Sequence, residues 1–269
     1  MIGEAYDTLV LSDVHLGSEL SRAQDALDVL QSHNFRRLVL LGDIFSDLNF
    51  RRLTSEHWKF LTHIRKLSNP KRRVEVVWVE GNHDHGLADV MSHLVGVPVY
   101  QRYVWEYAGK RHLAVHGHQF DRFVSKNLLI SRMGEQLFNR IQKLDSRSKR
   151  FSRFLDRTNT RWLRLSGKVA SGAINYARAG HCERVFCGHT HAALSLVRDG
   201  VEYYNSGSWV DARATFLLIN QDGVEIKDYA GTSHNRDTSE ERVAVPAEAV
   251  DLFEQAGLPA FARYQSLRC

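Results

Sequence analysis

Three short apolar segments, each ending in a polar cluster, constrain the fold more than any other feature of this sequence. The segments are Thr8–Leu11, Leu38–Leu41 and Val74–Val79. Helical patterns follow the first two, from Arg22 to about Ser32 and from about Ser55 to Leu67. Short buried strands that alternate with helices predict a βαβαβ unit with a mainly parallel sheet. In such a sheet the loops beyond the carboxyl ends of the strands gather at one edge, where ligands bind.

The rest of the chain predicts strands in a different arrangement. Tyr103–Tyr107 and His112–Val115 indicate a hairpin, and Arg184–Cys187 indicates a further strand. Four later segments are predicted to be antiparallel strands, with Asp-Gly turns in two of the connections: Leu194–Val197, Val201–Tyr204, Thr215–Ile219 and Val224–Lys227. We therefore expect an α/β fold in which a long segment is inserted between two strands.

Five polar clusters follow apolar strands and carry the chemistry. They are Asp13-Val14-His15, Gly42-Asp43, Gly81-Asn82-His83-Asp84, His116-Gly117-His118 and Gly188-His189-Thr190-His191. Asp, His and Asn side chains suit manganese, iron or zinc better than copper(I) or calcium. A mixed set of more than four ligands exceeds one tetrahedral zinc site, and it predicts two metal ions about 3.5–4 Å apart with a bridging carboxylate. Asp43 is the expected bridge, because its glycine neighbour lets the backbone approach the ions.

In this order, the five motifs resemble the calcineurin-like metallophosphoesterase superfamily, whose fold is a four-layer α-β-β-α sandwich. The resemblance implies one metal site formed by Asp13, His15, Asp43 and His191. It implies a second formed by Asp43, Asn82, His116 and His189. It also implies that His83 donates a proton or hydrogen bond to the phosphate, that Asp84 orients His83, and that Asn82 and His83 contact the substrate.

The expected reaction is hydrolysis of a phosphoester or diphosphate bond. A metal-bridging water has a lowered pKa and becomes a nucleophile at neutral pH. The cations also neutralise charge on the phosphate as the transition state forms. His118 is ambiguous, since a supporting role is as compatible with its position as a substrate contact. A binding protein on an inactive fold is disfavoured, because all seven expected metal ligands are present.

Residues 121–180, called the basic segment below, carry most of the positive charge. They contain 14 Lys and Arg against 4 Asp and Glu, whereas the rest of the chain has 22 basic and 27 acidic residues. The pattern predicts a basic helical cap inserted into a core of residues 1–120 and 181–230, followed by a tail of residues 231–269 with a short helix. Its basic side chains would hold phosphates or anionic headgroups. Ten of its apolar side chains would line a hydrocarbon groove: Leu128, Leu129, Met133, Leu137, Phe138, Phe151, Phe154, Leu155, Trp162 and Leu165.

The inserted cap resembles that of the UDP-2,3-diacylglucosamine diphosphatases of lipid A biosynthesis. That resemblance implies release of UMP and 2,3-diacylglucosamine 1-phosphate, with Mn²⁺ as the metal and Fe or Zn as the other possibilities. It also implies a peripheral protein on the cytoplasmic face of the inner membrane. The sequence departs from this family at His83, where members carry arginine, and at His118, where an acid is common.

Other substrates therefore remain open. A phosphodiesterase or nuclease would grip a nucleic acid backbone with the basic segment, but basic residues and aromatics do not alternate in a stacking pattern. A phosphatase of another nucleotide, lipid-linked or phosphoprotein substrate is the further alternative. Three cysteines are too few for a disulfide framework and fit a reducing, cytoplasmic setting. We expect neither a secretory signal in the first residues nor a membrane-spanning run.

Overall fold

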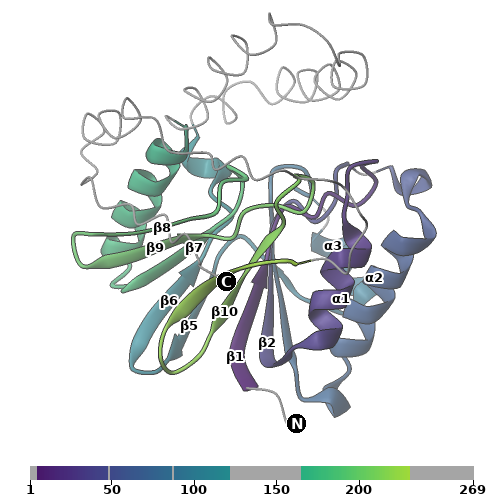
Figure 1. Cartoon of the computed structure of the whole chain (residues 1–269), viewed down its shortest axis with the longest axis horizontal. Coiled ribbons are helices and arrows are strands. Elements are labelled where there is room, and N and C mark those ends of the chain that lie inside the picture. Colours follow the sequence, from purple (N-terminus) through teal and green to yellow (C-terminus); the bar gives the residue numbers. More distant parts are fainter. Residues whose placement is uncertain (1–4, 48, 87, 122–164, 231–269) are drawn as a thin grey trace, which may run out of the picture.

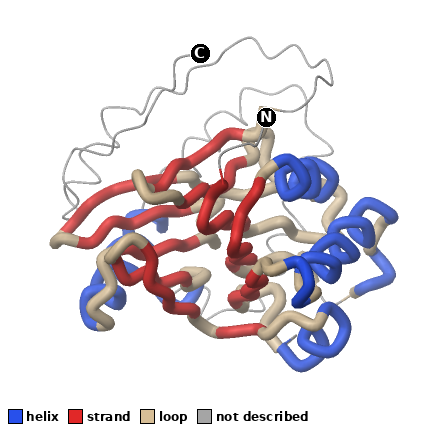
Figure 2. Tube along the Cα trace, turned by 90° about the horizontal axis from the view of Figure 1, so that it is seen from below, coloured by secondary structure: helices blue, strands red, loops and turns tan. Residues whose placement is uncertain are grey.

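Two β-sheets pack face to face, and helices cover both outer faces (Figure 1). The fold is taken from a computed structural model that describes residues 5–47, 49–86, 88–121 and 165–230. A view turned by 90° shows the strands in the middle and the helices on two flanks (Figure 2). This arrangement is the four-layer α-β-β-α sandwich expected from the sequence.

The first sheet has the strand order β11-β10-β1-β2-β3-β4. Its strands are β1 (Ala5–Leu11), β2 (Asn34–Leu41), β3 (Glu75–Val79), β4 (Val99–Tyr100), β10 (Thr215–Ile219) and β11 (Val224–Asp228). β1, β2, β3 and β4 run parallel, with Leu9 beside Leu38 and Leu40 beside Trp78. The predicted βαβαβ unit is therefore confirmed.

The second sheet has the order β5-β6-β7-β9-β8. Its strands are β5 (Tyr103–Tyr107), β6 (Lys110–Ala114), β7 (Arg184–Cys187), β8 (Leu194–Arg198) and β9 (Val201–Asn205). The β5–β6 pair is the predicted hairpin. The prediction that the last four strands are all antiparallel is wrong for β9, which also pairs parallel to β7. Alternating side chains show that a segment is a strand, but they do not show which sheet or neighbour it joins.

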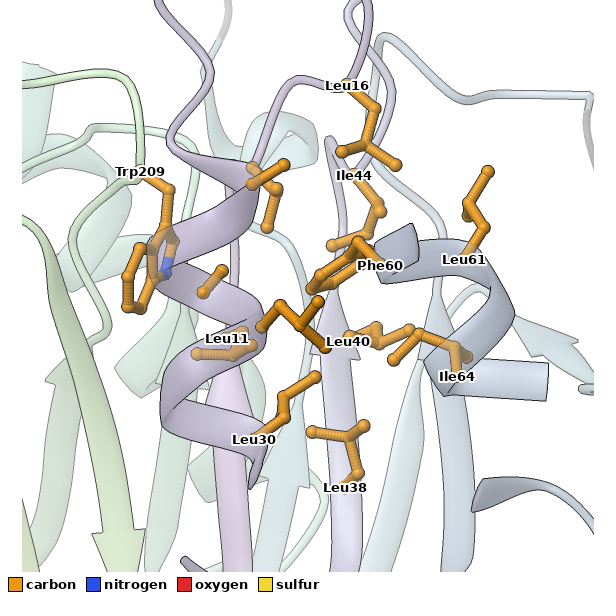
Figure 3. Close-up of a cluster of buried hydrophobic side chains, with 14 of the residues drawn as sticks. Leu11, Leu16, Leu30, Leu38, Leu40, Ile44, Phe60, Leu61, Ile64 and Trp209 are labelled. Atoms are coloured by element: carbon orange, nitrogen blue, oxygen red, sulfur yellow. The ribbon is translucent and has the colours of Figure 1, made fainter. Parts of the chain in front are cut away.

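Helices α1 (Ala23–Ser32), α2 (Ser55–Leu67) and α3 (Ala88–Val95) belong to the layer beside the first sheet. α2 begins at a capping box in which Thr54 Oγ1 accepts from the His57 backbone N–H and His57 Nδ1 accepts from the Thr54 N–H. Phe60 and Ile64 lie one turn apart on its inner face and are fully buried against the sheet (Figure 3). Burial of each such side chain stabilises the fold by about 1.5–3 kcal/mol. Three short 3₁₀ helices also lie among the described residues: Phe50–Arg52, Pro70–Arg72 and His118–Phe120.

A helix of residues 165–179 covers the second sheet. Ala170, Ala173, Ile174 and Ala177 pack against a cluster that includes Leu113. The sequence placed this helix in the inserted cap, but here it forms the outer layer of the sandwich. Cys182 and Cys187 are buried beside it as small hydrophobic side chains.

Most of the predicted cap lies outside the described residues. These are residues 122–164, together with the predicted tail and its short helix in residues 231–269. Of the apolar side chains expected to line a groove, Leu165 alone belongs to the described part. None of the described helices combines the length and the apolar character that a membrane span requires.

Candidate metal centre

The loops that follow β1, β2, β3, β6 and β7 meet at one edge of the two sheets, at the top of Figure 1. The Asp13 N–H donates to Gly42 O at 3.0 Å, and the His15 N–H donates to Asp43 O at 3.0 Å. The β1 and β2 loops therefore continue the parallel register of their strands. The His189 N–H donates to Asp13 Oδ2 at 3.0 Å, which joins the β7 loop from the second sheet to them.

Several of the predicted ligands have a left-handed backbone conformation. The φ angles are 52° at Asp13, 50° at His15, 50° at Asp43, 67° at His189 and 56° at His191. Among the described residues, these are five of the nine non-glycine positions with positive φ. Such conformations cost about 1–3 kcal/mol each and persist where the surroundings enforce them, typically at functional sites.

Asp13, His15 and His191 form one group of side chains able to hold a cation. One ligand atom from each lies within 4.8 Å of the other two. Asp13 Oδ1 is 3.3 Å from His191 Nε2 and 3.8 Å from His15 Nε2. The two imidazole Nε2 atoms are 3.3 Å apart. Two ring nitrogens and a carboxylate oxygen thus converge on one point.

Asp43, His116 and His189 form the second group within the same limit. His116 Nδ1 is bonded to Leu41 O at 2.9 Å, which turns Nε2 toward Asp43 Oδ2 at 3.2 Å. The rings of His116 and His189 meet edge to face with centroids 5.4 Å apart. Three ligand atoms are again directed at one point.

Buried atoms without partners test whether this edge fits metal ions. Asp13 Oδ1, Asn82 Oδ1 and His116 Nε2 are buried and make no hydrogen bond to any described residue. A buried polar atom left unsatisfied costs about 1–3 kcal/mol, so three such atoms in the motif loops call for a further partner. All three belong to the predicted ligand set, and their nitrogen and oxygen chemistry suits Mn, Fe or Zn. The residues fit two divalent ions.

Glycines in the motifs make room for the ligand side chains. A Cβ on Gly188 would lie 2.6 Å from Ser12 Oγ and closer still to Asp13 Oδ2. A Cβ on Gly81 would overlap the carboxylate of Asp43. The sequence argument concerned Gly42 and had it bring the backbone toward the ions, whereas in the structure a Cβ at Gly42 would overlap the ring of His116.

Burial and charge set the ionisation of the ligands. Burial raises the pKa of Asp43, but the charges of His116 and His83 outweigh it and hold the pKa well below its ordinary value. Burial lowers the pKa of His15 to about 3 and also lowers the pKa of His189. Neighbouring carboxylates outweigh burial at the other two histidines: they raise the pKa of His116 to about 9 and that of His191 well above its ordinary value, so metal binding there would displace a proton. An ionised carboxylate and neutral imidazoles are the forms that bind metals.

The structure places His83 beside Asp43 and gives its ring a hydrogen-bond partner in the backbone. His83 Nδ1 is bonded to Ser46 O at 2.9 Å, and its Nε2 lies 3.9 Å from Asp43 Oδ2. Asp84 was expected to orient His83. Instead its two oxygens accept from the Gly81 N–H at 2.6 Å and the Ile44 N–H at 2.9 Å, which ties the β2 and β3 loops together. Burial and the charge of Asp43 raise the pKa of Asp84 to about 6.

Two carboxylates beside the motif histidines were missed by sequence reasoning. Asp121 Oδ2 lies 3.4 Å from His189 Nε2, and Asp211 Oδ2 lies 3.6 Å from His191 Nδ1. Asp211 follows β9, which is parallel to β7 and ends at the same edge, so its strand position was the available signal. Asp121 had no motif and was assigned to the cap. His118 lies near both His116 and His189, and burial lowers its pKa to about 3.

The fold and its ligand edge define an α/β sandwich protein with a candidate two-metal centre. The sequence profile of the family described as calcineurin-like phosphoesterase matches residues 6–193, which include all five motifs. The chain belongs to this family of metal-dependent phosphoesterases, which bind two divalent ions.

Solved structures with a related architecture include the phosphoesterase YfcE from E. coli, at 17% identity and a TM-score of 0.48, covering 84% of this chain and 94% of that one. An archaeal phosphodiesterase matches at 13% identity and a TM-score of 0.45, covering 82% and 98%. Vps29 from Entamoeba histolytica in complex with zinc matches at 14% identity and a TM-score of 0.43, covering 82% and 98%. Similarity at this level carries no information on substrate. No curated protein sequence matches the chain.

Proposed function

We propose that this protein hydrolyses UDP-2,3-diacylglucosamine to UMP and 2,3-diacylglucosamine 1-phosphate. Phosphoester hydrolysis follows from the family, and the proposal concerns the substrate. Water adds to the α-phosphorus, the bond from that phosphorus to the bridging oxygen breaks, and the sugar 1-phosphate leaves. A peripheral position on the cytoplasmic face of the inner membrane, held by the basic segment, belongs to the same proposal.

The contact between Asp121 and His189 carries the proposal. Asp121 is the first residue of the basic segment, is only 5% exposed, and lies 3.4 Å from a predicted ligand. After the undescribed stretch, the helix of residues 165–179 returns to the same place, because a Cβ on Gly117 would lie 3.1 Å from Val169 Cγ1. Two described parts of a segment with a net charge of +10 therefore lie next to the motif loops. Such a charge favours a diphosphate and an anionic lipid surface.

The expected ligands keep their assignments in this proposal. Asp13, His15, Asp43 and His191 would hold one ion, and Asp43, Asn82, His116 and His189 the other. When bound, the two ions, expected to be Mn²⁺, supply a water of lowered pKa and neutralise charge on the phosphates. The Asp43 carboxylate is held in place because Oδ1 accepts the His83 backbone N–H at 2.8 Å.

His83 is proposed as the hydrogen-bond or proton donor. The bond from Nδ1 to the Ser46 carbonyl fixes the ring and directs Nε2 into the site. From there, a protonated His83 can donate to a phosphate oxygen or to the departing sugar phosphate. General acid catalysis of this kind contributes about 10²–10⁴ to the rate.

Hydrolysis of a nucleic acid backbone is the second candidate, because the same basic segment favours it. That function predicts DNA binding that weakens steeply as salt is raised. Strong retention of single- or double-stranded DNA at physiological salt would support it against the lipid substrate.

The deciding experiment compares substrates with Mn²⁺ in detergent. UDP-2,3-diacylglucosamine is assayed beside UDP-glucose, bis-p-nitrophenyl phosphate and a phosphopeptide, with His116→Ala as the inactive control. We expect selective release of UMP from the acylated substrate. Turnover of only the generic diester or the phosphopeptide would show that the substrate assignment is wrong while leaving the two-metal chemistry in place.

A further inference from the structure

Each histidine of the Gly188–His191 motif lies against a carboxylate outside the predicted ligand set. Asp121 Oδ2 is 3.4 Å from His189 Nε2, and Asp211 Oδ2 is 3.6 Å from His191 Nδ1. The two carboxylates come from different elements. Asp121 follows the 3₁₀ helix His118–Phe120, and Asp211 lies in the loop between β9 and β10.

Each carboxylate lies against one ring nitrogen of its histidine and leaves the other nitrogen for a metal. His191 Nε2 points at Asp13 Oδ1 and His15 Nε2, both at 3.3 Å, so Nε2 is its ligand atom and Asp211 lies on the opposite nitrogen. For His189, Asp121 lies at Nε2, so Nδ1 is the atom left to ligate. Neither carboxylate belongs to the two convergent groups found among the described residues.

Both carboxylates are themselves held in place. The Asp121 N–H donates to His118 O at 3.0 Å, and its side chain is only 6% exposed. Asp211 is half exposed, but its Oδ2 accepts from Ser208 Oγ at 2.6 Å. These contacts keep the two carboxylates beside their histidines.

We propose that Asp121 and Asp211 are positioning residues, one for each metal ion, acting through His189 and His191. A carboxylate that accepts the second N–H of a ligating histidine fixes its tautomer and ring orientation and raises its basicity. Loss of such a partner lowers metal affinity by about 10–100-fold. The inference rests on the ligand roles of His189 and His191 in the proposed function, but not on any particular substrate.

The test measures Mn²⁺ binding by calorimetry and by the electron paramagnetic resonance signal of a coupled Mn²⁺ pair. The full chain is compared with Asp121→Ala, Asp121→Asn, Asp211→Ala and Asp211→Asn. His189→Ala and His191→Ala define the loss of each site. Asp28→Ala is the control, because Asp28 accepts hydrogen bonds from Gln24 and Tyr229 in another part of the fold.

We expect each alanine variant to weaken one of the two Mn²⁺ sites by about 10–100-fold and to reduce the coupled-pair signal. Asp121→Ala should match the site lost in His189→Ala, and Asp211→Ala the site lost in His191→Ala. The asparagine variants, which retain an acceptor oxygen, should recover part of the affinity. Asp28→Ala should bind both ions as the parent does.

Unfolding measured in EDTA, without bound metal, distinguishes a loss of Mn²⁺ affinity from a loss of stability. A loss below threefold in a folded alanine variant overturns the assignment for that residue. If Asp121→Ala does not fold, Asp121→Leu, which also lacks an acceptor, replaces it under the same threshold. Equal weakening of both sites would also overturn it, since the effect would then be general. If His189→Ala and His191→Ala still bind two ions with parental affinity, the ligand assignments of the proposed function fail instead.

Discussion

Replacing Gly188 with alanine should damage the metal centre although it adds a single methyl group. The new Cβ would lie 2.6 Å from Ser12 Oγ and 2.7 Å from Ser12 Cβ, where ordinary contacts begin at 3.4 Å. The two Ser12 atoms must therefore move by about 0.7–0.8 Å. Ser12 resists, because it is buried and its Oγ is bonded to Ser206 Oγ at 2.7 Å and Gly207 O at 3.1 Å.

The displacement falls on Asp13, whose Oδ2 is nearer to the added methyl than either Ser12 atom. We expect Gly188→Ala to lower the free energy of unfolding by about 1–3 kcal/mol, the usual cost of overpacking. Displacing a reacting group by about 1 Å can cost about 10²-fold in rate, so kcat/KM should fall by that order.

The assays are urea unfolding in EDTA and hydrolysis of bis-p-nitrophenyl phosphate with Mn²⁺. Gly180→Ala is the matched control, since its added Cβ meets nothing nearer than 3.5 Å, and its φ is not in the left-handed region. It should change stability by less than about 0.5 kcal/mol. A Gly188→Ala protein as stable and active as Gly180→Ala would refute the steric reasoning.

Three further predictions test the centre and the core. Asn82→Ala or His116→Ala should lose one metal and nearly all activity while the far-UV circular dichroism stays unchanged; two bound ions by metal analysis would contradict the ligand roles. His83→Ala should lower turnover by about 10²–10⁴ with both metals retained, and loss of metal would show that His83 is a ligand. Burial lowers the pKa of His112 to about 4 in the folded protein, compared with about 6.5 in the unfolded chain. As the pH drops from 6.5 to 4, the unfolded chain therefore binds the proton before the folded protein does, and the free energy of unfolding falls. His112 should lower the free energy of unfolding by about 2 kcal/mol at pH 5 relative to pH 7. Urea unfolding of His112→Phe should lack this contribution, and a pH dependence equal to that of the parent would contradict the prediction.

The sequence was sufficient to predict the parallel unit and the ligand edge. The strand ends Leu11 and Leu41 are each followed two residues later by an aspartate, Asp13 or Asp43, and parallel strands deliver such residues to one edge. The hydrogen bond between His83 and the backbone carbonyl of Ser46 could not be predicted, because every residue has such a carbonyl.

Strand partners outside the parallel unit were also beyond the sequence. β8 and β9 form a local hairpin, and so do β10 and β11, but β10 then pairs with β1 at the other end of the chain. Nothing in the alternation of apolar residues encodes that long-range choice. Asp121 was missed for a related reason. It belongs to no motif, and its contact with His189 joins residues far apart in the sequence.

The left-handed backbone at five ligand positions means that the metal centre lowers the stability of the fold. At about 1 kcal/mol or more for each position, the chain gives up several kcal/mol of the stability that its two-sheet core could provide. Glycine adopts such angles without steric strain, so His15→Gly would abolish a ligand yet relieve backbone strain. Because His15 is buried, the lost ring offsets that relief, so the strain is a stability cost that the ligand positions retain.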